Sequence, residues 1–427
     1  MNKEWKEVKL ENVTTILGDG LHGTPAYDEV GDYYFINGNN LRDGSIVIDD
    51  KTRRVSAFEY KKHKKNLNDR TILVSINGTL GNVALYHGEK VVLGKSACYF
   101  NVKEDTNKQF VRYVITSDLF QTYIHNLATG STIKNVSLKL MRNFSFRLPP
   151  PKLQKEIATI LGALDDRITL LRETNATLEA IAQALFKSWF VDFDPVHAKA
   201  QGTKPEGMDE QTAALFPDRF VESELGMVPL GWEVVAFTET INIIGGGTPK
   251  TAISEYWNGE IPWFSVVDAP KTTDVFVVNT DKHITEFGLK NSSAKLLSIG
   301  TTIISARGTV GKLALVGSEM AMNQSCYGLR GKIGDEYFTY FSTYRLVETL
   351  KQRTHGSVFD TITRDTLAGV FITYPTEVII NAFEKLLYPI MERIKENLKQ
   401  AQTLADLRDT LLPRLISGQL RLPDVEA

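Results

Sequence analysis

The chain contains the stretch Asp69-Arg-Thr-Ile-Leu-Val-Ser-Ile-Asn-Gly-Thr-Leu-Gly-Asn-Val-Ala-Leu-Tyr86 and a matching stretch, Ile299-Gly-Thr-Thr-Ile-Ile-Ser-Ala-Arg-Gly-Thr-Val-Gly-Lys-Leu-Ala-Leu-Val316, at an offset of 230 in the numbering. In both stretches a β-branched and aliphatic run ends at a Gly-Thr-x-Gly turn, which predicts a strand followed by a tight turn. A single match at so large an offset predicts a duplicated domain and not a solenoid.

Further landmarks recur in the same order along the chain. Trp5 matches Trp232, Gly23-Thr24-Pro25 matches Gly247-Thr248-Pro249, and Ser96-Ala97-Cys98-Tyr99 matches Gln324-Ser325-Cys326-Tyr327. Their offsets, like that of the first match, stay between 224 and 230. Helical patterns follow the strands in each copy, at 110–126 and 337–354. We therefore expect an α+β protein with two homologous α/β domains.

Each copy closes with a long helix, which follows Pro149-Pro150-Pro151 in the first copy and Pro375 in the second. Apolar residues recur every seven positions in both helices, and adding 226 to a seam position of the first gives one of the second. Such a seam needs an apolar partner, and the simplest partner is the other helix. We expect an interface formed by Ile157, Leu164, Leu171, Asn175, Leu178 and Leu185 with Phe383, Ile390, Asn397, Leu404 and Leu411.

Antiparallel pairing of the two helices predicts which residues meet. If the helices overlap end to end, Ile157 lies opposite Leu415 and Asn175 opposite Asn397. A second heptad position of the distal helix, which includes Leu415, also carries Arg408. A buried asparagine pair fixes register at some cost in stability. The alternative is that each helix covers only its own domain. A helix of roughly 38 residues is about 57 Å long, enough to hold two domains apart.

Composition and charge indicate a globular protein of two or three domains, with 42% hydrophobic and 23% charged residues in 427. The net charge of −2 is not typical of a nucleic-acid binder. Residues 1–150, however, hold 21 Lys and Arg against 16 Asp and Glu, a net +5 that leaves −7 for the rest. The most basic stretch, 51–70, is either a phosphate-facing strip or a solvated surface.

Catalytic and targeting motifs are missing from the sequence. The only Pro-Pro lies between Leu148 and Lys152, unlike an adenine-methyltransferase loop, and neither Gly-x-Gly-x-x-Gly nor Gly-x-x-x-x-Gly-Lys-Ser/Thr occurs. No Cys or His has metal-ligand spacing. We therefore predict no catalytic residue, no metal site and no cofactor. Without a long apolar run or a signal peptide, we expect a cytoplasmic protein, with Cys98 and Cys326 as buried free thiols.

Several strings resemble the specificity subunits of type I restriction-modification systems. They are Leu185-Phe-Lys-Ser-Trp-Phe-Val-Asp-Phe-Asp194 with Pro195, Glu224-Leu-Gly-x-x-Pro-x-Gly-Trp232, Leu411-Leu-Pro-Arg-Leu-Ile-Ser-Gly418 and the two Gly-Thr-x-Gly turns. The resemblance covers essentially the whole chain. It divides the chain into a first target recognition domain (1–150), a central helix (151–195), a linker (196–222), a second target recognition domain (223–375), a distal helix (376–420) and a tail (421–427).

The resemblance implies two target recognition domains separated by a pair of long antiparallel helices in a pseudo-twofold repeat. Each domain would read one half of an asymmetric double-stranded DNA target, and the helices would set the unread gap. It further implies two methyltransferase subunits, which carry S-adenosylmethionine, and restriction/motor subunits, which use ATP and Mg²⁺. None of these cofactors would bind this chain.

For DNA contacts we favour loops that combine a flexible backbone with hydrogen-bond donors, together with basic residues nearby. These candidates are Lys61, Lys62, Lys64, Lys65, Asn77, Thr79, Lys95, Lys134, Arg307, Thr309, Lys312 and Arg364. Trp189, Phe190 and Phe193 are more typical of a core or subunit interface than of base stacking. Three alternatives stay open: a subunit for a fused methyltransferase-nuclease, a self-contained methyltransferase, and a paired-helix scaffold that binds no DNA.

Overall fold

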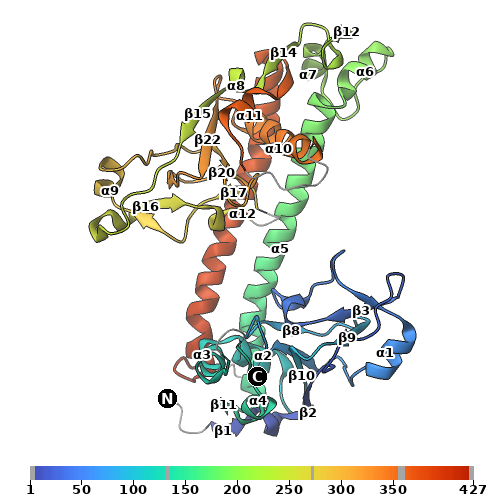
Figure 1. The fold of residues 1–427 in the computed structure, drawn as a ribbon, viewed down its shortest axis with the longest axis vertical. Helices are drawn as coiled ribbons and strands as arrows, with labels where there is room; N and C mark the ends of the chain where they lie inside the picture. The colour runs from blue at the N-terminus through green and yellow to red at the C-terminus, as the bar shows by residue number, and fades with distance from the viewer. Residues whose placement is uncertain (1–4, 131–133, 271–273, 354–360, 423–427) are drawn as a thin grey trace. The chain divides into compact units, whose positions relative to one another are not determined.

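The computed structural model describes residues 5–130, 134–270, 274–353 and 361–422. The chain forms two compact units that both contain helices and sheets (Figure 1). The first unit comprises Met1–Arg167 and Leu404–Ala427, and the second comprises Ile168–Thr403. The second unit is therefore a continuous segment inserted in the sequence of the first.

The first unit is built on an antiparallel sheet in the order β2-β10-β7-β8, formed by Thr14–Asp19, Ala97–Val102, Thr71–Ser75 and Val83–Leu85. Every residue of β7 is buried, as its unbroken apolar run predicts. A second sheet has the order β6-β3-β9, formed by Arg54–Val55, Tyr33–Ile36 and Val91–Leu93. β1 (Lys6–Lys9) pairs with β11 (Ser145–Leu148), and β4 (Leu41–Arg42) pairs with β5 (Ser45–Ile46).

The short helices of the first unit are α1 (Ala57–His63), α2 (Lys108–Thr116), α3 (Asp118–Leu127) and α4 (Leu138–Asn143). The single helix expected over 110–126 is interrupted at Ser117. The backbone of Ser117 is extended, with φ −73° and ψ 157°, and its hydroxyl donates to the carbonyl of Val114 at 2.6 Å. Ser117 therefore ends α2 and begins α3.

The second unit repeats the order of the main sheet as β15-β22-β19-β20, with β17 added at the edge. These strands are Ile241–Gly245, Cys326–Gly331, Thr302–Ser305, Leu313–Val316 and Phe276–Val277. β14 (Glu233–Ala236) pairs with β23 (Phe371–Tyr374) as β1 pairs with β11. The remaining strands are β18 (His283–Ile284), β16 (Trp257–Phe264), β21 (Ala321–Met322), β12 (Phe220–Ser223) and β13 (Gly226–Pro229). The duplication read from the sequence is thus a duplication of topology.

The short helices of the second unit are α6 (Asp194–Ala200), α7 (Glu210–Leu215), α8 (Phe237–Thr240), α9 (Glu286–Lys290), α10 (Glu336–Arg353) and α11 (Arg364–Ala368). α10 covers the helix expected over 337–354, whose last residue lies outside the described part of the chain. α6 and α7 occupy much of the segment 196–222, which we had expected to be a linker.

Two long helices, α5 (Pro151–Phe190) and α12 (Glu377–Ile416), each contain 40 residues and contribute to both units. In the first unit, Ile157 and Leu415 lie in one hydrophobic cluster. In the second unit, the rings of Trp189 and Phe383 are 5.6 Å apart. Asp165 also contacts Arg408 in the first unit, and Asn175 contacts Asn397 in the second. Within each unit a later residue of α5 thus meets an earlier residue of α12, so the helices run antiparallel. The eleven seam residues that we expected at the interface are all buried or partly buried.

Both long helices end before the predicted boundaries. α5 stops at Phe190 and not at residue 195, because Phe193 adopts a left-handed conformation with φ 54° and Pro195 then opens α6. α12 stops at Ile416 and not at residue 420, close to Gly418 with φ 71°. Of the predicted tail, residues 423–427 lie outside the described residues.

The two cysteines are free and buried, as the sequence predicts. Burial raises the pKa of the Cys326 thiol to about 12 and that of Cys98 further still. Both side chains therefore stay protonated and pack as small apolar groups. In the described ranges, no helix has the length and apolar character needed to cross a membrane.

Candidate nucleic-acid interface

The first Gly-Thr-x-Gly turn follows β7 in the first unit. Gly78 and Gly81 have φ of 76° and 83°, a left-handed conformation that glycine adopts without strain. The side-chain nitrogen Nδ2 of Asn77 donates to Oδ1 of Asn135 at 3.3 Å, and the amide of Gly78 donates to the carbonyl of Lys134 at 3.2 Å. The turn is thus tied to the segment that leads into α4.

A groove of about 460 Å³ lies beside this turn. Its lining residues come from four parts of the chain and are Asp19, His22, Ile76, Asn77, Lys95, Asn135, Val136, Ser137 and Leu138. His22 Nε2 lies 2.6 Å from Asp19 Oδ2. Two amides, an imidazole, a carboxylate and an ammonium group provide the donors and acceptors that read base edges and phosphates.

The groove combines expected and unexpected residues. Asn77 and Lys95 both line it, and Lys134 lies next to its wall at Asn135. Thr79 is exposed in the turn, and its hydroxyl oxygen lies 3.1 Å from that of Ser75. Asp19, His22 and Asn135 were missed by sequence reasoning. The only signal was their position next to Gly23-Thr24-Pro25 and to Lys134.

The second unit has the same arrangement with different side chains. Arg307 forms a β-bridge with Thr361, as Asn77 does with Asn135. The amide of Ile362 donates to Ala306 at 2.9 Å, as that of Val136 donates to Ile76 at 2.8 Å. Arg307, Thr309 and Arg364 are exposed, and Arg364 begins α11 three residues after Thr361. The structure therefore places these three candidates in one region of the second unit.

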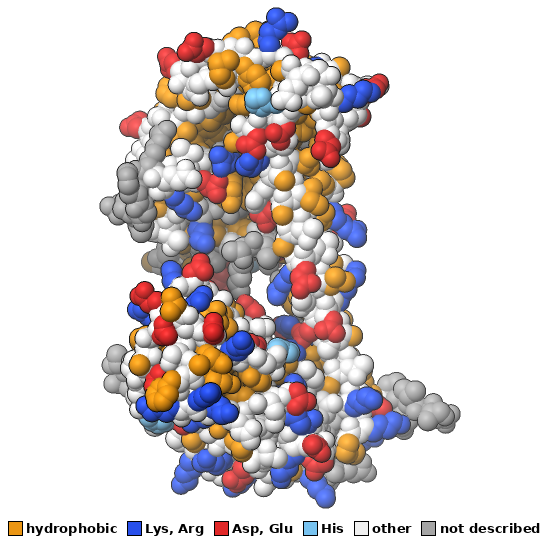
Figure 2. Space-filling view, turned by 90° about the vertical axis from the view of Figure 1, so that its right-hand side faces the viewer, with side chains coloured by type: hydrophobic (Ala, Val, Ile, Leu, Met, Phe, Trp, Pro, Cys, Tyr) orange, Lys and Arg blue, Asp and Glu red, His pale blue; other side chains and the backbone are white. Residues whose placement is uncertain are grey.

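Among the remaining candidates, Lys312 directly follows the second turn, whereas the four lysines at 61–65 lie apart from both turns. Lys312 lines a separate groove of about 530 Å³, together with Glu179 of α5 and Glu348 of α10. Lys61 and Lys62 occupy the last turn of α1, followed by Lys64 and Lys65, and Lys62 lies 3.7 Å from Glu59. Figure 2 shows basic side chains interspersed with acidic ones on the face that it draws. The four lysines thus form a basic segment of their own.

The aromatic side chains at the end of α5 belong to the core of the second unit. Trp189 and Phe190 are buried in a cluster with Trp232 and Phe383, and the rings of Phe193 and Trp232 are 5.6 Å apart. The prediction of a core role is confirmed. The glycine run at 245–247 also has a packing role, because a Cβ on Gly246 would lie 2.0 Å from the carbonyl oxygen of Asn323.

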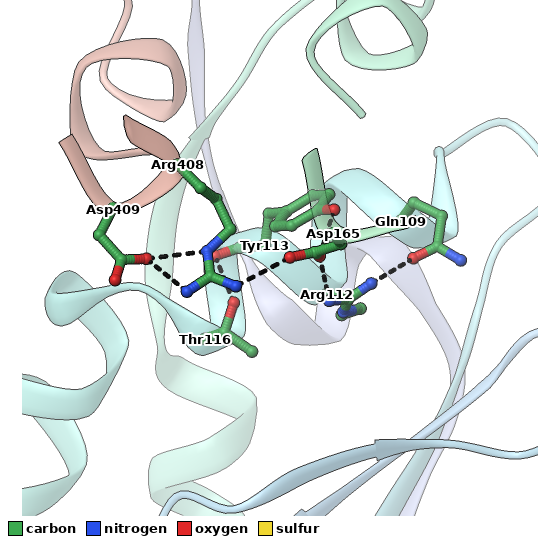
Figure 3. Close-up of polar contacts among 7 residues, drawn as sticks. All are labelled: Gln109, Arg112, Tyr113, Thr116, Asp165, Arg408 and Asp409. Carbon is green, nitrogen blue, oxygen red and sulfur yellow. Dashed lines mark hydrogen bonds and ion pairs between the residues drawn. The ribbon is translucent and has the colours of Figure 1, made fainter. Parts of the chain in front are cut away.

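A charged cluster joins α2, α5 and α12 within the first unit (Figure 3). Asp165 Oδ2 accepts from Arg112 Nη2 at 2.6 Å and from the Tyr113 hydroxyl at 2.7 Å. Asp165 Oδ1 accepts from Arg408 Nη1 at 2.9 Å, and Arg408 Nε donates to Asp409 at 2.8 Å. Burial tends to raise the pKa of Asp165, but the hydrogen bonds and the arginine charges outweigh it and hold the pKa below its usual value.

The long helices also carry a buried polar pair in the second unit. Asn397 Nδ2 donates to Asn175 Oδ1 at 2.9 Å, and Asn175 Nδ2 donates to the carbonyl of Ile394 at 3.0 Å. Both asparagines are almost completely buried. The seam pattern predicted this opposition. The same register places Asp165 next to Arg408, but we expected no such pair because Asp165 lies outside the seam.

Two repeated α+β units that share a pair of long helices define a class of internally duplicated proteins. The family of the type I restriction modification DNA specificity domain matches residues 2–180 and 229–400. The chain belongs to this family.

Individual relatives agree with this assignment. The chain is 28% identical over 359 residues to the type I restriction enzyme HindI specificity subunit of Haemophilus influenzae, covering 73% of this chain and 77% of that protein. It is 24% identical over 433 residues to the MjaIX specificity subunit of Methanocaldococcus jannaschii, covering 99% and 95%. The crystal structure of a type I restriction-modification S subunit from M. genitalium has a TM-score of 0.52 and 18% identity, covering 97% of both chains. That last likeness concerns the fold alone.

Proposed function

We propose that this chain is the DNA-reading specificity subunit of a type I restriction-modification system and that each unit reads one half of an asymmetric, gapped target. The Gly-Thr-x-Gly site that occurs twice with unlike side chains carries this proposal. Asn77 and Asn135 meet at the first turn, and Arg307 and Thr361 meet at the second. One chain would therefore present the same backbone arrangement twice, each time with different side chains available to hydrogen-bond with bases.

The side chains of the two turns suggest different preferences. Asparagine makes two hydrogen bonds to the edge of adenine, whereas arginine makes two to guanine. Lysines such as Lys95 and Lys134 are suited to phosphate, and Lys61 to Lys65 would add further phosphate contacts. The second unit lies in the acidic part of the chain, so its contact with DNA would be local, around Arg307 and Arg364.

The chain itself would be non-catalytic. Methyltransferase subunits, two in number, would carry S-adenosylmethionine, and restriction/motor subunits would use ATP and Mg²⁺. The long helices would set the length of the unread gap. Because the substrate is cellular DNA, we place the protein in the cytoplasm. A self-contained methyltransferase would bind S-adenosylmethionine, and we expect equilibrium dialysis of the isolated chain to detect no binding.

Mapping of methylated bases by long-read sequencing, in cells that produce this chain with its modification partner, tests the proposal. We expect one gapped motif with two unlike halves. Asn77→Ala should relax one half and Arg307→Ala the other, with a loss of about 1–3 kcal/mol of discrimination at the affected base. Lys204→Ala, at a side chain that is 84% exposed, should change neither half.

An ungapped motif, or a change of both halves by one of these substitutions, would contradict the assignment of one reader to each unit.

A further inference from the structure

The two long helices are copies of each other, yet at four of the positions where they contact each other one copy carries a polar residue and the other an apolar one. α5 and α12 have the same length, and adding 226 to any residue number of α5 gives its equivalent in α12. Asp165 and Asn175 of α5 correspond to Met391 and Ala401 of α12. Arg408 and Asn397 of α12 correspond to Ala182 and Leu171 of α5. Each polar seam residue thus has an apolar equivalent in the other helix.

The four polar residues contact one another in pairs. Asp165 is bonded to Arg408 at 2.9 Å in the first unit, and Asn175 to Asn397 at 2.9 Å in the second. Their apolar equivalents are buried as well, and Ala182 and Met391 lie in the same core cluster. Each of the four polar residues therefore finds a polar partner when α5 pairs with α12.

Pairing of like helices from two molecules, in the same antiparallel register, would break these matches. In an α5 pair, Asn175 would lie opposite Leu171 and Asp165 opposite Ala182. In an α12 pair, Asn397 would lie opposite Ala401 and Arg408 opposite Met391. A buried polar group that loses its partner keeps its full desolvation cost, and twofold symmetry would impose each mismatch twice.

The cost would fall unequally on the two like pairs. Asp165 would keep Arg112 and Tyr113, which belong to its own copy of the repeat. Arg408 would keep Asp409, whose side chain is 62% exposed. We therefore expect the pairing of α12 with itself to be the less favourable of the two.

We propose that the Asp165–Arg408 and Asn175–Asn397 pairs make the pairing of α5 with α12 exclusive, so that a second copy of this chain cannot exchange like helices with the first. A single buried polar residue is known to select register and partner in paired helices, and mismatched polar groups reject wrong partners. The consequence, which rests on the proposed function, is that each long-helix pair joins the first reader to the second and not to a copy of itself. Recognition of an asymmetric target requires two unlike readers in one assembly.

The test replaces these four polar residues in the full-length chain. The fourfold variant Asp165→Met, Asn175→Ala, Asn397→Leu and Arg408→Ala gives each helix the residue that its copy carries. Chains with two different affinity tags are unfolded, mixed in equal amounts and refolded at high concentration. Chains with the first tag are then captured, and the amount of chain with the second tag that is captured with them is measured. Mass photometry gives the mass of the captured species.

We expect the unchanged chain to refold as monomers with background co-capture. The fourfold variant should form mixed dimers, with co-capture at least tenfold higher. Asn175→Ala with Asn397→Leu should give an intermediate rise of at least threefold, and this pair leaves the Asp165 cluster intact. Arg172→Ala with Lys399→Ala, at exposed positions of the same helices, is the matched control and should stay monomeric.

The proposal is overturned if the fourfold variant keeps its helical circular dichroism and co-captures no more than the unchanged chain. It is equally overturned if the unchanged chain forms as many mixed dimers as the variant. If the fourfold variant loses its helical circular dichroism, the double variant Asn175→Ala with Asn397→Leu serves as the test. The proposal is then overturned if co-capture of this double variant does not rise above that of the unchanged chain. Since these measurements involve no DNA, their outcome is independent of whether the chain reads a gapped target.

Discussion

At the scale of single residues, Asp165 depends on its partners in the first unit, because its carboxylate is only 16% exposed and accepts hydrogen bonds from three donors. Asp165→Ala would leave Arg112 and Arg408 without that partner. We expect it to lower the free energy of unfolding of the first unit by about 2–4 kcal/mol. Asp165→Ala with Arg408→Ala should cost less than the sum of the two single changes.

The pKa of Asp165 gives this prediction a pH dependence. The folded pKa lies below the ordinary value of 3.8, so the stability that the group contributes is present above about pH 4 and is lost as the pH falls. Urea unfolding at pH 7 and at pH 3.5 measures both effects. Asp166→Ala, next to it but exposed, is the control, and an equal loss of stability in both variants would contradict the role of the cluster.

The chemistry of single residues was only partly predictable. Asn77 and Arg307 stood out because they occupy the same place in two matching turns. Asp19 and His22 carry no such signal, because the groove arises where loops distant in the sequence converge. Asp165 meets Arg112, 53 positions away, and Arg408, 243 positions away. The heptad register placed Asp165 close to Arg408, but it contains no information on the contact with Arg112 of α2.

At the scale of elements, α12 caps the N-terminus of α10 through a buried carboxyl. Glu384 Oε1 accepts from the amides of Phe338 at 2.8 Å and Tyr337 at 3.0 Å. Burial is the main cause that raises the pKa of Glu384 to about 8; the two amides act in the opposite sense, and the nearby Asp335 and Glu336 add to the rise. The folded state thus retains a proton that the unfolded chain, with an ordinary pKa of 4.5, releases.

This raised pKa predicts that the second unit loses stability as the pH rises from about 5 to about 8, since the folded state binds more protons there. Glu384→Gln keeps an oxygen acceptor and removes the titration. The difference in unfolding free energy between pH 5 and pH 8 should shrink by on the order of 3 kcal/mol. Chemical unfolding at the two pH values measures it, with Glu396→Gln at an exposed position as control. An unchanged difference would show that Glu384 does not titrate in this range.

The elements themselves followed from the sequence where periodicity was long. Five heptads in each copy predicted both long helices and the opposition of Asn175 and Asn397, because one seam shared by two helices leaves little choice of register. Short-range exceptions were not predictable. The helical pattern over 110–126 does not show the break at Ser117, which depends on a local hydrogen bond. The pattern that ends the first long helix likewise does not show the left-handed conformation of Phe193.

At the scale of the whole molecule, both ends of the chain contribute to the first unit, and the second unit is one uninterrupted segment. The last part of α12 contributes Leu415 and Ile416 to the core that also holds Trp5 and Ile157. Sequence reasoning treated 1–150 as a domain by itself and the distal helix as a separate element. The core of the first unit in fact includes residues from the far end of α12. The heptad register placed Leu415 opposite Ile157, but it gave no indication that both belong to the core of the first domain.

A chain that ends after Thr403 tests this dependence. It lacks Arg408, Leu415 and Ile416 but retains the whole second unit. Loss of two buried aliphatic side chains and of one charge partner should cost the first unit about 5 kcal/mol or more, comparable to its entire stability. Hydrogen exchange read by mass spectrometry should then show loss of protection in β7 and β10 and retained protection in β19 and β22. A chain that ends after Leu422 is the control and should protect both units. Equal protection of β7 and β19 in the shorter chain would mean that the first unit folds without the end of α12.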